Sequence, residues 1–263
     1  PVRLVSVVGK DFPAGVIDML ASRSIDTRGL KIADGETFRW KGFYEYDLNT
    51  AHTIKTELNV FRDFAPVLPA SFRDSPYVFL GNIDPRLQMD ILGQVRKPKL
   101  VALDTMNYWI GNSPGLLREV IGKVDIVVFN EGEIREISGE YNLIKAARAV
   151  MGWGPSRVVI KRGEYGVLHI SDGTMFAAPA YPLETIFDPT GAGDSFAGGF
   201  MGYLASRGEG ELTDKDYRLA TMYGSAIASF TVEAFSTERL QRLSVGDISE
   251  RVEAFRTLTE FRV

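Results

Sequence analysis

The sequence contains no cysteine and only two histidines, His52 and His169. Without cysteine there is no disulfide, no thiolate nucleophile and no zinc site with cysteine ligands, and two histidines are too few for a metal centre of several imidazoles. No apolar run reaches the length of a membrane-spanning helix. We therefore expect a cytoplasmic protein in which both histidines lie at the surface or pack against neighbours.

The chain also lacks an excess of positive charge. Its 263 residues carry a formal net charge of −4 and an isoelectric point near 5.4. A protein that binds nucleic acid or an anionic membrane through a broad surface needs a basic face, so we expect neither partner. A hydrophobic content of 45% is ordinary for a globular protein and supplies a sizeable core.

Short apolar runs alternate with longer amphipathic segments. The expected strands are 4–8, 77–80, 100–103, 126–129, 158–160 and 167–170, and the expected helices include 85–95, 114–121 and 143–151. Several strands are apolar on both faces, which is typical of parallel strands covered by helices. The alternation predicts a three-layer α/β domain.

Residues 35–61 break this alternation. Aromatic and β-branched residues alternate there with charged ones, the period-2 pattern of a partly exposed antiparallel hairpin. Such a hairpin is either a lid over a site or an edge decoration, and the pattern favours neither. Its aromatic residues are suited to stacking on a sugar or a nucleobase: Phe38, Trp40, Phe43 and Tyr44.

The most informative run of residues is Asp188-Pro-Thr-Gly-Ala-Gly-Asp194-Ser-Phe196. The turn at 191–193 can expose several backbone N–H groups on one side, and a helix from Asp194 to residue 206 directs its positive end at the same point. A carboxylate at a helix start usually only caps it. Two glycines directly before it, however, favour a base beside an anion site, the arrangement that phosphoryl transfer needs.

Other functions that use glycine-rich motifs fit poorly. The sequence has no phosphate-binding loop ending in Gly-Lys-Ser/Thr, and a dinucleotide fingerprint would need Gly or Ala where Phe196 stands. Residues 111–115 match the Gly-x-Ser-x-Gly motif of serine hydrolases. The residue after Ser113 is Pro114, which has no N–H to offer an oxyanion, so we expect no hydrolase.

The run from Asp188 to Phe200 resembles the C-terminal motif of the PfkB family, which includes ribokinase, fructokinases and adenosine kinase. The resemblance implies a ribokinase-like three-layer α/β/α fold with a mostly parallel central sheet. It implies one domain over residues 1–263, with a small β-sheet lid at about 35–61. ATP and Mg²⁺ are the implied cofactors, a sugar or nucleoside is the implied acceptor, and a homodimer through the lid is one implied assembly.

The same resemblance assigns roles within the run. It implies that Asp194 is the catalytic base and that Gly191, Ala192 and Gly193 form the anion hole. In many members the leading Asp and Thr lie beside a monovalent cation, which implies a K⁺ site at Asp188 and Thr190.

Two shorter motifs precede this run in the family's order. Asn130-Glu-Gly-Glu133 is similar to the family's Asn-x-x-Glu motif, which organises Mg²⁺ and phosphates, although a helix N-cap with a capping-box Glu also fits. Lys161-Arg-Gly163-Glu-Tyr-Gly166 is similar to the family's hairpin along the nucleotide. The implied cofactor contacts are Asn130, Glu133 (to Mg²⁺, largely through water), Lys161, Gly163 and Gly166.

Four further residues are weaker candidates. Asp104 and Asn107 follow a strand, and open α/β sheets bind ligands at the carboxyl ends of their strands. These two either contact the acceptor or belong to an Asx turn. Gly224 and Ser225 lie in a segment that we expect beside the adenine of the nucleotide.

The family's opening strand, with its sugar-binding Asp and the following Gly-Gly-x-x-x-Asn segment, is not visible in this sequence. We expect that an N-terminal strand–helix unit is missing, which would weaken the acceptor half of the site. The alternative to a kinase is therefore a non-catalytic nucleotide-binding or regulatory relative. These motifs leave open which sugar or nucleoside is the acceptor.

Overall fold

The computed structural model describes residues 1–46, 48–49 and 51–260. The chain forms two compact units, the first made of Pro1–Val78 and Ile83–Lys99, the second of Phe79–Asn82 and Leu100–Val263. The first unit contains the expected lid, of which Asp47 and Thr50 lie outside the described residues, as do residues 261–263 of the expected single domain. No described helix is both long and apolar enough to cross a membrane.

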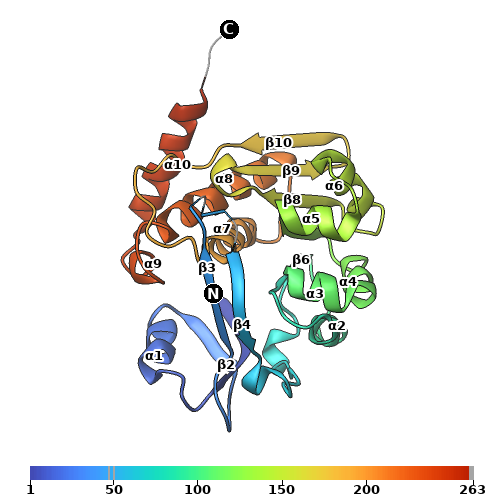
Figure 1. Cartoon of the computed structure of the whole chain (residues 1–263), viewed down its shortest axis with the longest axis vertical. Coiled ribbons are helices and arrows are strands. Elements are labelled where there is room, and N and C mark those ends of the chain that lie inside the picture. The colour runs from blue at the N-terminus through green and yellow to red at the C-terminus, as the bar shows by residue number, and fades with distance from the viewer. Residues whose placement is uncertain (47, 50, 261–263) are drawn as a thin grey trace. The chain divides into compact units, whose positions relative to one another are not determined.

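A six-stranded sheet in the order β10-β9-β8-β7-β6-β5 organises the second unit (Figure 1), and the first two residues of its edge strand β5 are counted with the first unit. Its strands are β5 (Tyr77–Leu80), β6 (Leu100–Asp104), β7 (Ile126–Asn130), β8 (Arg157–Lys161), β9 (Val167–Ser171) and β10 (Thr174–Ala178). Strands β6, β7 and β8 pair in parallel, whereas β9 and β10 follow as antiparallel neighbours. The three parallel strands are almost entirely buried, because they are apolar on both faces.

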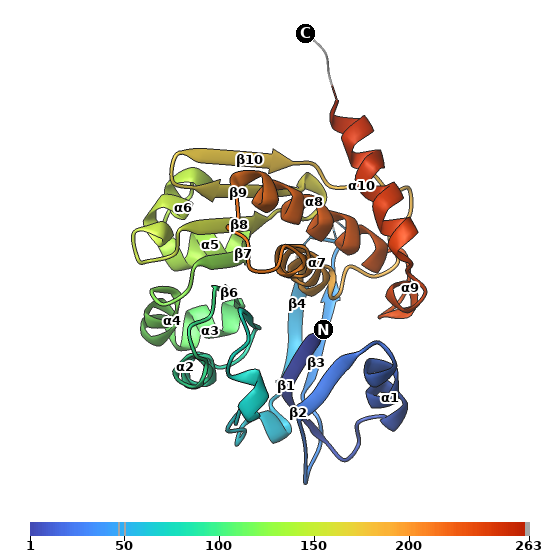
Figure 2. The ribbon, with the colours of Figure 1, turned by 180° about the vertical axis from the view of Figure 1, so that it is seen from behind.

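Helices cover both faces of this sheet (Figures 1 and 2). On one face lie α5 (Glu131–Ser138) and α6 (Leu143–Met151), and on the other lie α7 (Ala192–Ser206) and α8 (Asp214–Thr231). The remaining helices of the unit are α3 (Asn107–Asn112), α4 (Pro114–Ile121), η3 (Gly163–Tyr165), α9 (Glu238–Gln241) and α10 (Val245–Thr259). A Cβ on Gly199 of α7 would lie 2.9 Å from the Tyr223 carbonyl oxygen of α8. Glycine at this position therefore permits the close approach of the two helices.

The first unit contains two small sheets. Strands β1 (Val2–Gly9) and β2 (Ile25–Ala33) pair in parallel and are connected by α1 (Ala14–Ser22). Strands β3 (Arg39–Tyr44) and β4 (Ala51–Glu57) form an antiparallel hairpin. The unit also contains η1 (Asn59–Phe61), η2 (Ala70–Phe72) and α2 (Pro85–Gln94). Asp11 accepts hydrogen bonds from the N–H and the hydroxyl of Thr37, each at 2.7 Å, and so fixes the start of the hairpin to the end of β1.

The structure confirms the α/β class, the helices on both faces and the hairpin within 35–61. Each expected strand lies within an observed one, with end differences of a few residues. Strands β2 and β10 were not expected. Of the residues in β2, none is fully buried, so the strand lacks the continuous apolar run by which the central strands were recognised. That the hairpin is a lid stays a prediction.

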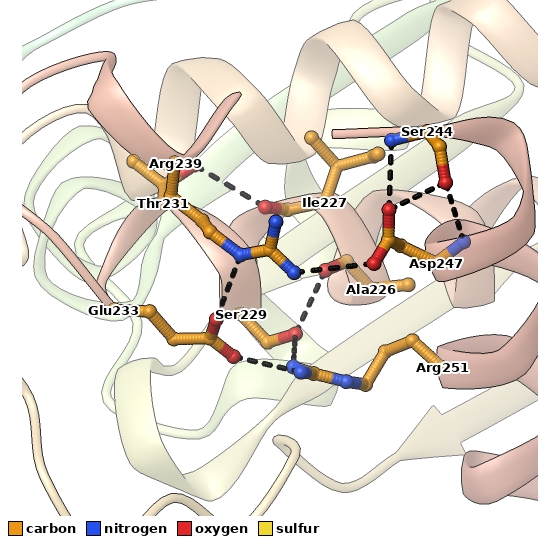
Figure 3. A network of polar contacts seen from close by, with 9 residues as sticks. All are labelled: Ala226, Ile227, Ser229, Thr231, Glu233, Arg239, Ser244, Asp247 and Arg251. Carbon is orange, nitrogen blue, oxygen red and sulfur yellow. Dashed lines mark hydrogen bonds and ion pairs between the residues drawn. The ribbon is translucent and has the colours of Figure 1, made fainter. Parts of the chain in front are cut away.

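A polar network closes the end of α8 (Figure 3). Glu233 accepts hydrogen bonds from Arg239 at 3.2 Å and from Arg251 at 2.7 Å. Arg251 also donates to the Ser229 hydroxyl at 2.7 Å, and Arg239 reaches Asp247 at 3.4 Å. We call these five residues, Ser229, Glu233, Arg239, Asp247 and Arg251, the C-terminal network.

The C-terminal network lies next to residues 179–187, which connect β10 to the run that begins at Asp188. The guanidinium of Arg251 stacks over the ring of Tyr181 at 4.1 Å and over that of Phe230 at 4.0 Å. The Phe187 N–H donates to the Val232 carbonyl at 2.9 Å. Tyr181 and Phe187 bracket this segment, so Arg251 of α10 contacts one end of it and the end of α8 contacts the other.

Candidate active site

Helix α7 begins at Ala192, two residues before the expected start at Asp194. Its N-cap is Gly191, whose φ of +81° lies in the left-handed region that glycine adopts without strain. This backbone turn lets the helix start earlier than a carboxylate cap would. Asp194 is the third residue of the helix, and no side chain of the described residues caps this end. Its carboxylate is therefore not used for capping, which was the structural alternative to a catalytic role.

The backbone N–H groups at this helix end divide into two kinds. The Ala192 N–H donates to the Pro189 carbonyl at 3.1 Å, and the Ser195 N–H donates to the Gly191 carbonyl at 2.9 Å. The N–H groups of Gly193 and Asp194 make no hydrogen bond to any described residue. Of the expected anion hole, Ala192 is thus already engaged in a turn, while Gly193 and Asp194 offer donors to an anion.

Lys161, the last residue of β8, lies against this helix end. Its ammonium is 3.1 Å from a carboxylate oxygen of Asp104, the last residue of β6. A Cβ on Gly193 would lie 3.0 Å from the same ammonium nitrogen, closer than side chains normally pack. The carboxyl ends of β6 and β8 therefore bring an ion pair to Gly193, whose N–H has no partner in the described part of the chain.

Carboxyl groups outnumber cations around Lys161. Burial raises the pKa of Asp194, and the nearby Asp104 carboxylate raises it further, while Lys161 lowers it. The Asp194 side chain still reaches solvent, so its carboxylate is accessible to a ligand. Burial alone would lower the pKa of Lys161, but Asp104 and Glu133 outweigh it and the pKa is raised. The ammonium stays charged.

Asn130 and Glu133 form a capping box at the start of α5. The Asn130 side chain accepts the Glu133 N–H at 2.8 Å, and the Glu133 carboxylate accepts the Asn130 N–H at 2.7 Å. The structure confirms the capping box, which holds Glu133 in a buried position, and the Mg²⁺ role of the motif stays a prediction. Burial raises the pKa of Glu133 to about 7, although Lys161 opposes the shift.

Within residues 1–46, 48–49 and 51–260, no group of three or more His, Asp or Glu side chains is arranged to hold a metal ion. Mg²⁺ in nucleotide-dependent enzymes takes one or two carboxylates, several waters and the substrate phosphates, and needs no such cage. The oxygen chemistry of Glu133 fits this kind of contact.

The expected glycine hairpin between β8 and β9 is present. The Arg162 N–H donates to the Gly166 carbonyl at 2.8 Å, and Gly163 and Gly166 have φ values of +55° and +85°. A Cβ on Gly166 would overlap the Ala178 carbonyl oxygen at 2.1 Å. The turn thus needs glycine at 166 for packing, independently of any nucleotide.

The remaining candidates lie in different surroundings. Asp104 is buried, and its other oxygen accepts the N–H of the next residue, Thr105, at 2.8 Å. An Asx turn would use the N–H two residues on, so that alternative stays a prediction. The Asn107 amide donates to Glu136 at 2.6 Å and is exposed. Sequence reasoning missed the pairing of Asp104 with Lys161, because the two residues are 57 positions apart. Their shared place at strand ends was the only signal.

The side chain of Asp188 accepts the Thr190 N–H at 2.9 Å, an Asx turn that orders the chain before Gly191. A Cβ on Gly224 would lie 2.8 Å from the Phe196 carbonyl oxygen, so packing between α7 and α8 accounts for this glycine, and Ser225 beside it is buried. The cation role of the first pair and the adenine role of the second stay predictions.

Both histidines make packing contacts. His52 stacks on Phe43 in the hairpin, with ring centroids 5.0 Å apart. His169 is buried against Phe200 and Tyr217, and burial lowers its pKa to about 4.

Comparison with known proteins decides the family. Residues 83–241, more than half of the 263-residue chain, match the pfkB family carbohydrate kinase model. The chain is 37% identical over 213 residues to the cytidine kinase of Thermococcus kodakarensis, covering 78% of this chain and 75% of that protein. The chain belongs to the pfkB family of carbohydrate kinases. It is an enzyme that transfers a phosphoryl group from ATP to a small molecule.

Other pfkB relatives cover nearly the whole chain. The nucleoside kinase of Methanothermobacter thermautotrophicus is 28% identical over 258 residues, covering 96% of this chain and 78% of that protein. The crystal structure of Methanocaldococcus jannaschii nucleoside kinase matches with a TM-score of 0.75 at 22% identity, over 96% of this chain and 80% of that one. A putative ribokinase II from E. coli in complex with ATP and Mg²⁺ matches with a TM-score of 0.78 at 20% identity, over 97% and 83%. These structures establish the ribokinase-like fold.

Proposed function

We propose that this pfkB kinase phosphorylates a hydroxyl group of a nucleoside, with cytidine as the first candidate, and that Asp194 is the catalytic base. The observation that carries the proposal is the geometry of α7. Asp194 lies in its first turn, and its carboxylate makes no capping bond among the described residues. Its own N–H and that of Gly193 have no partner in the described part of the chain, and the Lys161 ammonium lies beside Gly193. A base, anion donors and a cation at one point are the parts that phosphoryl transfer needs.

In the proposed reaction, the Asp194 carboxylate accepts the proton of the acceptor hydroxyl. The hydroxyl oxygen forms a bond to the terminal phosphorus of ATP, and the bond from that phosphorus to the bridging oxygen breaks, releasing ADP. The N–H groups of Gly193 and Asp194 and the Lys161 ammonium stabilise the charge on the phosphoryl oxygens. Gly191 shapes the turn that points these N–H groups outward, and Ala192 starts the helix.

The cofactor contacts follow from the same end of the sheet. Asn130 and Glu133 would hold Mg²⁺ through its waters, and Mg²⁺ would neutralise charge on the ATP phosphates. The Gly163–Gly166 turn would lie along the nucleotide, with Gly224 and Ser225 near its base. Asp188 and Thr190 would hold a monovalent cation, which would add positive charge behind the anion site.

The choice of a nucleoside rests on the relatives. A cytidine kinase matches 78% of this chain and a nucleoside kinase matches 96% of it. A sugar acceptor has weaker support, since the ribokinase of Haemophilus influenzae matches at 30% identity over only 119 residues. Asn107, exposed at the start of α3, remains our proposed contact to the acceptor.

Self-association of the protein is a further part of the proposal. Phe43 and Ile54 of the β3–β4 hairpin are 49% and 58% exposed, which favours self-association of the protein through this hairpin. Light scattering of the intact protein and of a Phe43→Ser, Ile54→Ser variant tests it, and a monomeric wild-type protein would refute it.

A panel of acceptors tests the function. ADP release is measured with MgATP and, in turn, cytidine, uridine, adenosine, ribose and deoxyribose. We expect the highest kcat/KM with cytidine, and measurable rates with other nucleosides. Turnover of the sugars alone would refute the nucleoside assignment. ATP binding without ADP release for any acceptor would favour the non-catalytic alternative, which the intact set of Asp194, Lys161 and free N–H groups argues against.

A further inference from the structure

Strand β8 carries a cation at each end, and the two are held differently. Arg157 at its start pairs with Asp214 at 2.7 Å, where the Asp214 side chain is 46% exposed. Lys161 at its end pairs with Asp104 at 3.1 Å, where the side chains are 19% and 6% exposed. An exposed ion pair changes the free energy of folding little, because both ions keep most of their water. A buried pair requires the removal of water from both ions, which costs free energy. The buried position of the second pair therefore calls for an explanation other than stability.

The Asp104 carboxylate is held by the backbone as well as by Lys161. One carboxylate oxygen accepts the N–H of the next residue, Thr105, at 2.8 Å, and the other accepts the Lys161 ammonium. A carboxylate held by its own backbone restricts the ammonium to one place. A lysine side chain carries about 2 kcal/mol of rotamer entropy, and this restriction removes that disorder before a ligand arrives.

The place to which the ammonium is restricted is the helix end itself. The position of a Cβ on Gly193 is 3.0 Å from the Lys161 nitrogen and 3.7 Å from each of its last two carbons. The side chain of Lys161 thus lies along Gly193, whose N–H has no partner among the described residues. An anion bound to that N–H meets the ammonium without any movement of Lys161.

We propose that Asp104 is a positioning residue, which fixes the Lys161 ammonium beside Gly193 so that it contacts the phosphoryl group during transfer. This assignment rests on the proposed function, and it replaces a contact of Asp104 with the acceptor. The carboxylate partly cancels the attraction of Lys161 for ATP. Its contribution is therefore geometric and acts on the transition state more than on ATP binding.

Kinetics of four variants test the assignment: Asp104→Asn, Lys161→Met, the double variant, and Asp214→Asn as the control from the other end of β8. Asn at 104 keeps the oxygen that accepts the Thr105 N–H and loses only the charge. We expect Asp104→Asn to lower kcat about tenfold without raising KM for ATP or for the acceptor. Lys161→Met should lower kcat about a hundredfold, and the double variant should be no slower than Lys161→Met, because Asp104 acts through Lys161.

The pH profile supplies a readout that a merely structural role would not move. The charged groups that face Asp194 are Asp104 from β6 and Lys161 from β8, and Glu133 from α5 in turn faces Lys161. Asp104 raises the pKa of Asp194 and Lys161 lowers it. The acidic limb of kcat should therefore shift to lower pH in Asp104→Asn and to higher pH in Lys161→Met. It should not shift in Asp214→Asn.

Three results would overturn the assignment. Additive effects in the double variant would show that Asp104 does not act through Lys161. A raised KM for the acceptor in Asp104→Asn would place Asp104 at the acceptor instead. Acidic limbs that shift in the same direction, or not at all, would remove Asp104 and Lys161 from the surroundings of the base.

If the wild-type protein turns over no acceptor, the proposed function fails, and the assignment is then tested by binding. The side-chain ammonium signal of Lys161 is followed by NMR in ¹⁵N-lysine-labelled protein, with a non-hydrolysable ATP analogue and Mg²⁺. We expect the signal to shift with the analogue in the wild-type protein and to be broadened or lost in Asp104→Asn. A Lys161 signal that ignores the analogue, or that is the same in both proteins, would overturn the assignment.

Discussion

The charges at the start of α7 and those at the end of α8 are arranged in opposite ways. At the start of α7, the single ammonium of Lys161 faces the carboxyl groups of Asp104, Glu133 and Asp194. In the C-terminal network, two guanidinium groups share Glu233 and one of them also reaches Asp247 (Figure 3). One region has too few cations for its carboxyl groups, and the other has enough.

The pKa values follow this difference. Burial raises the pKa of Asp194 in α7 and that of Glu133 in α5, two of the three carboxyl groups around Lys161. Hydrogen bonds from Ser244, and then the nearby Arg239, lower the pKa of Asp247 to about 2. A satisfied network stabilises the fold and needs no ligand. Carboxyl groups with raised pKa values in a partly enclosed place are typical of a functional site, because a cationic or proton-donating ligand completes them.

The largest effect is expected from Asp194→Asn. Removal of the base should lower kcat about 10³-fold, since a positioned base contributes about 10²- to 10⁴-fold. Because the pKa of Asp194 is raised, the wild-type kcat should fall with decreasing pH above the range of an ordinary Asp. Steady-state kinetics between pH 4 and 9 measure both. Asp172→Asn, an exposed Asp in the β9–β10 turn, is the control and should match the wild type.

Substitutions in the C-terminal network should lower the stability of the protein and leave its catalytic rate unchanged. Arg251→Met keeps most of the side chain's stem but removes bonds to Ser229 and Glu233 and the stacking on Tyr181. We expect a loss of about 2–3 kcal/mol in the free energy of unfolding, measured by urea denaturation.

Arg256→Met is the matched control in the same helix, since the Arg256 side chain is 71% exposed and pairs only with Glu253 among the described side chains. It should change stability by less than about 0.5 kcal/mol. A shifted acidic limb of kcat in Arg251→Met would contradict the separation of the two regions.

A smaller effect is expected from Gly193→Ala. The new methyl group would lie 3.0 Å from the Lys161 ammonium and would displace it by a few tenths of an ångström. We expect kcat to fall about tenfold with little change in stability, because the displaced atom is the end of a flexible side chain. Gly198→Ala in the same helix meets nothing within 4 Å and should leave kcat unchanged while stabilising the helix by about 0.5–1 kcal/mol. Equal kinetics in the two variants would refute the contact.

The smallest effect concerns His169, which lies in neither region. Its buried ring forms a hydrogen bond with the Thr221 hydroxyl, and burial lowers its pKa to about 4. Below the ordinary pKa of about 6.5, the unfolded chain binds a proton that the folded chain does not, so stability falls as the pH falls toward 4. Between pH 7 and 5.5 this loss should be about 1 kcal/mol. In His169→Gln, thermal unfolding at the two pH values should lose this dependence; an unchanged dependence would assign it to other groups.

Much of the fold was predictable, because the buried strands β6, β7 and β8 are continuous apolar runs. Strand β2 was not predictable, since all its side chains are partly exposed. Its partner β1 is separated from it in the sequence by helix α1. At the site, the run from Asp188 to Phe196 predicted the helix start with its exposed backbone N–H groups, whereas the role of Asp194 as the base stays a prediction. The earlier helix start follows from the left-handed Gly191, and a sequence does not reveal which glycine of two takes that conformation.

Long-range pairs were beyond the sequence for a physical reason. Asp104 and Lys161 meet because β6, β7 and β8 are neighbours in this order, and no local pattern encodes the order of strands. Arg251 reaches Ser229 for the same kind of reason, since the contact depends on how α10 packs on α8. The residue types did not indicate these contacts, because most lysines and arginines lie at the surface.

The most direct test of the account measures ATP binding and phosphoryl transfer in the same preparation of Asp194→Asn. Calorimetry gives the affinity for MgATP, and ATP labelled in its terminal phosphoryl group gives the transfer to cytidine in a single turnover. We expect Asp194→Asn to bind ATP with an affinity close to that of the wild type and to leave the label on ATP, whereas the wild-type protein transfers it. Transfer by Asp194→Asn at the wild-type rate would contradict the assignment of Asp194 as the base.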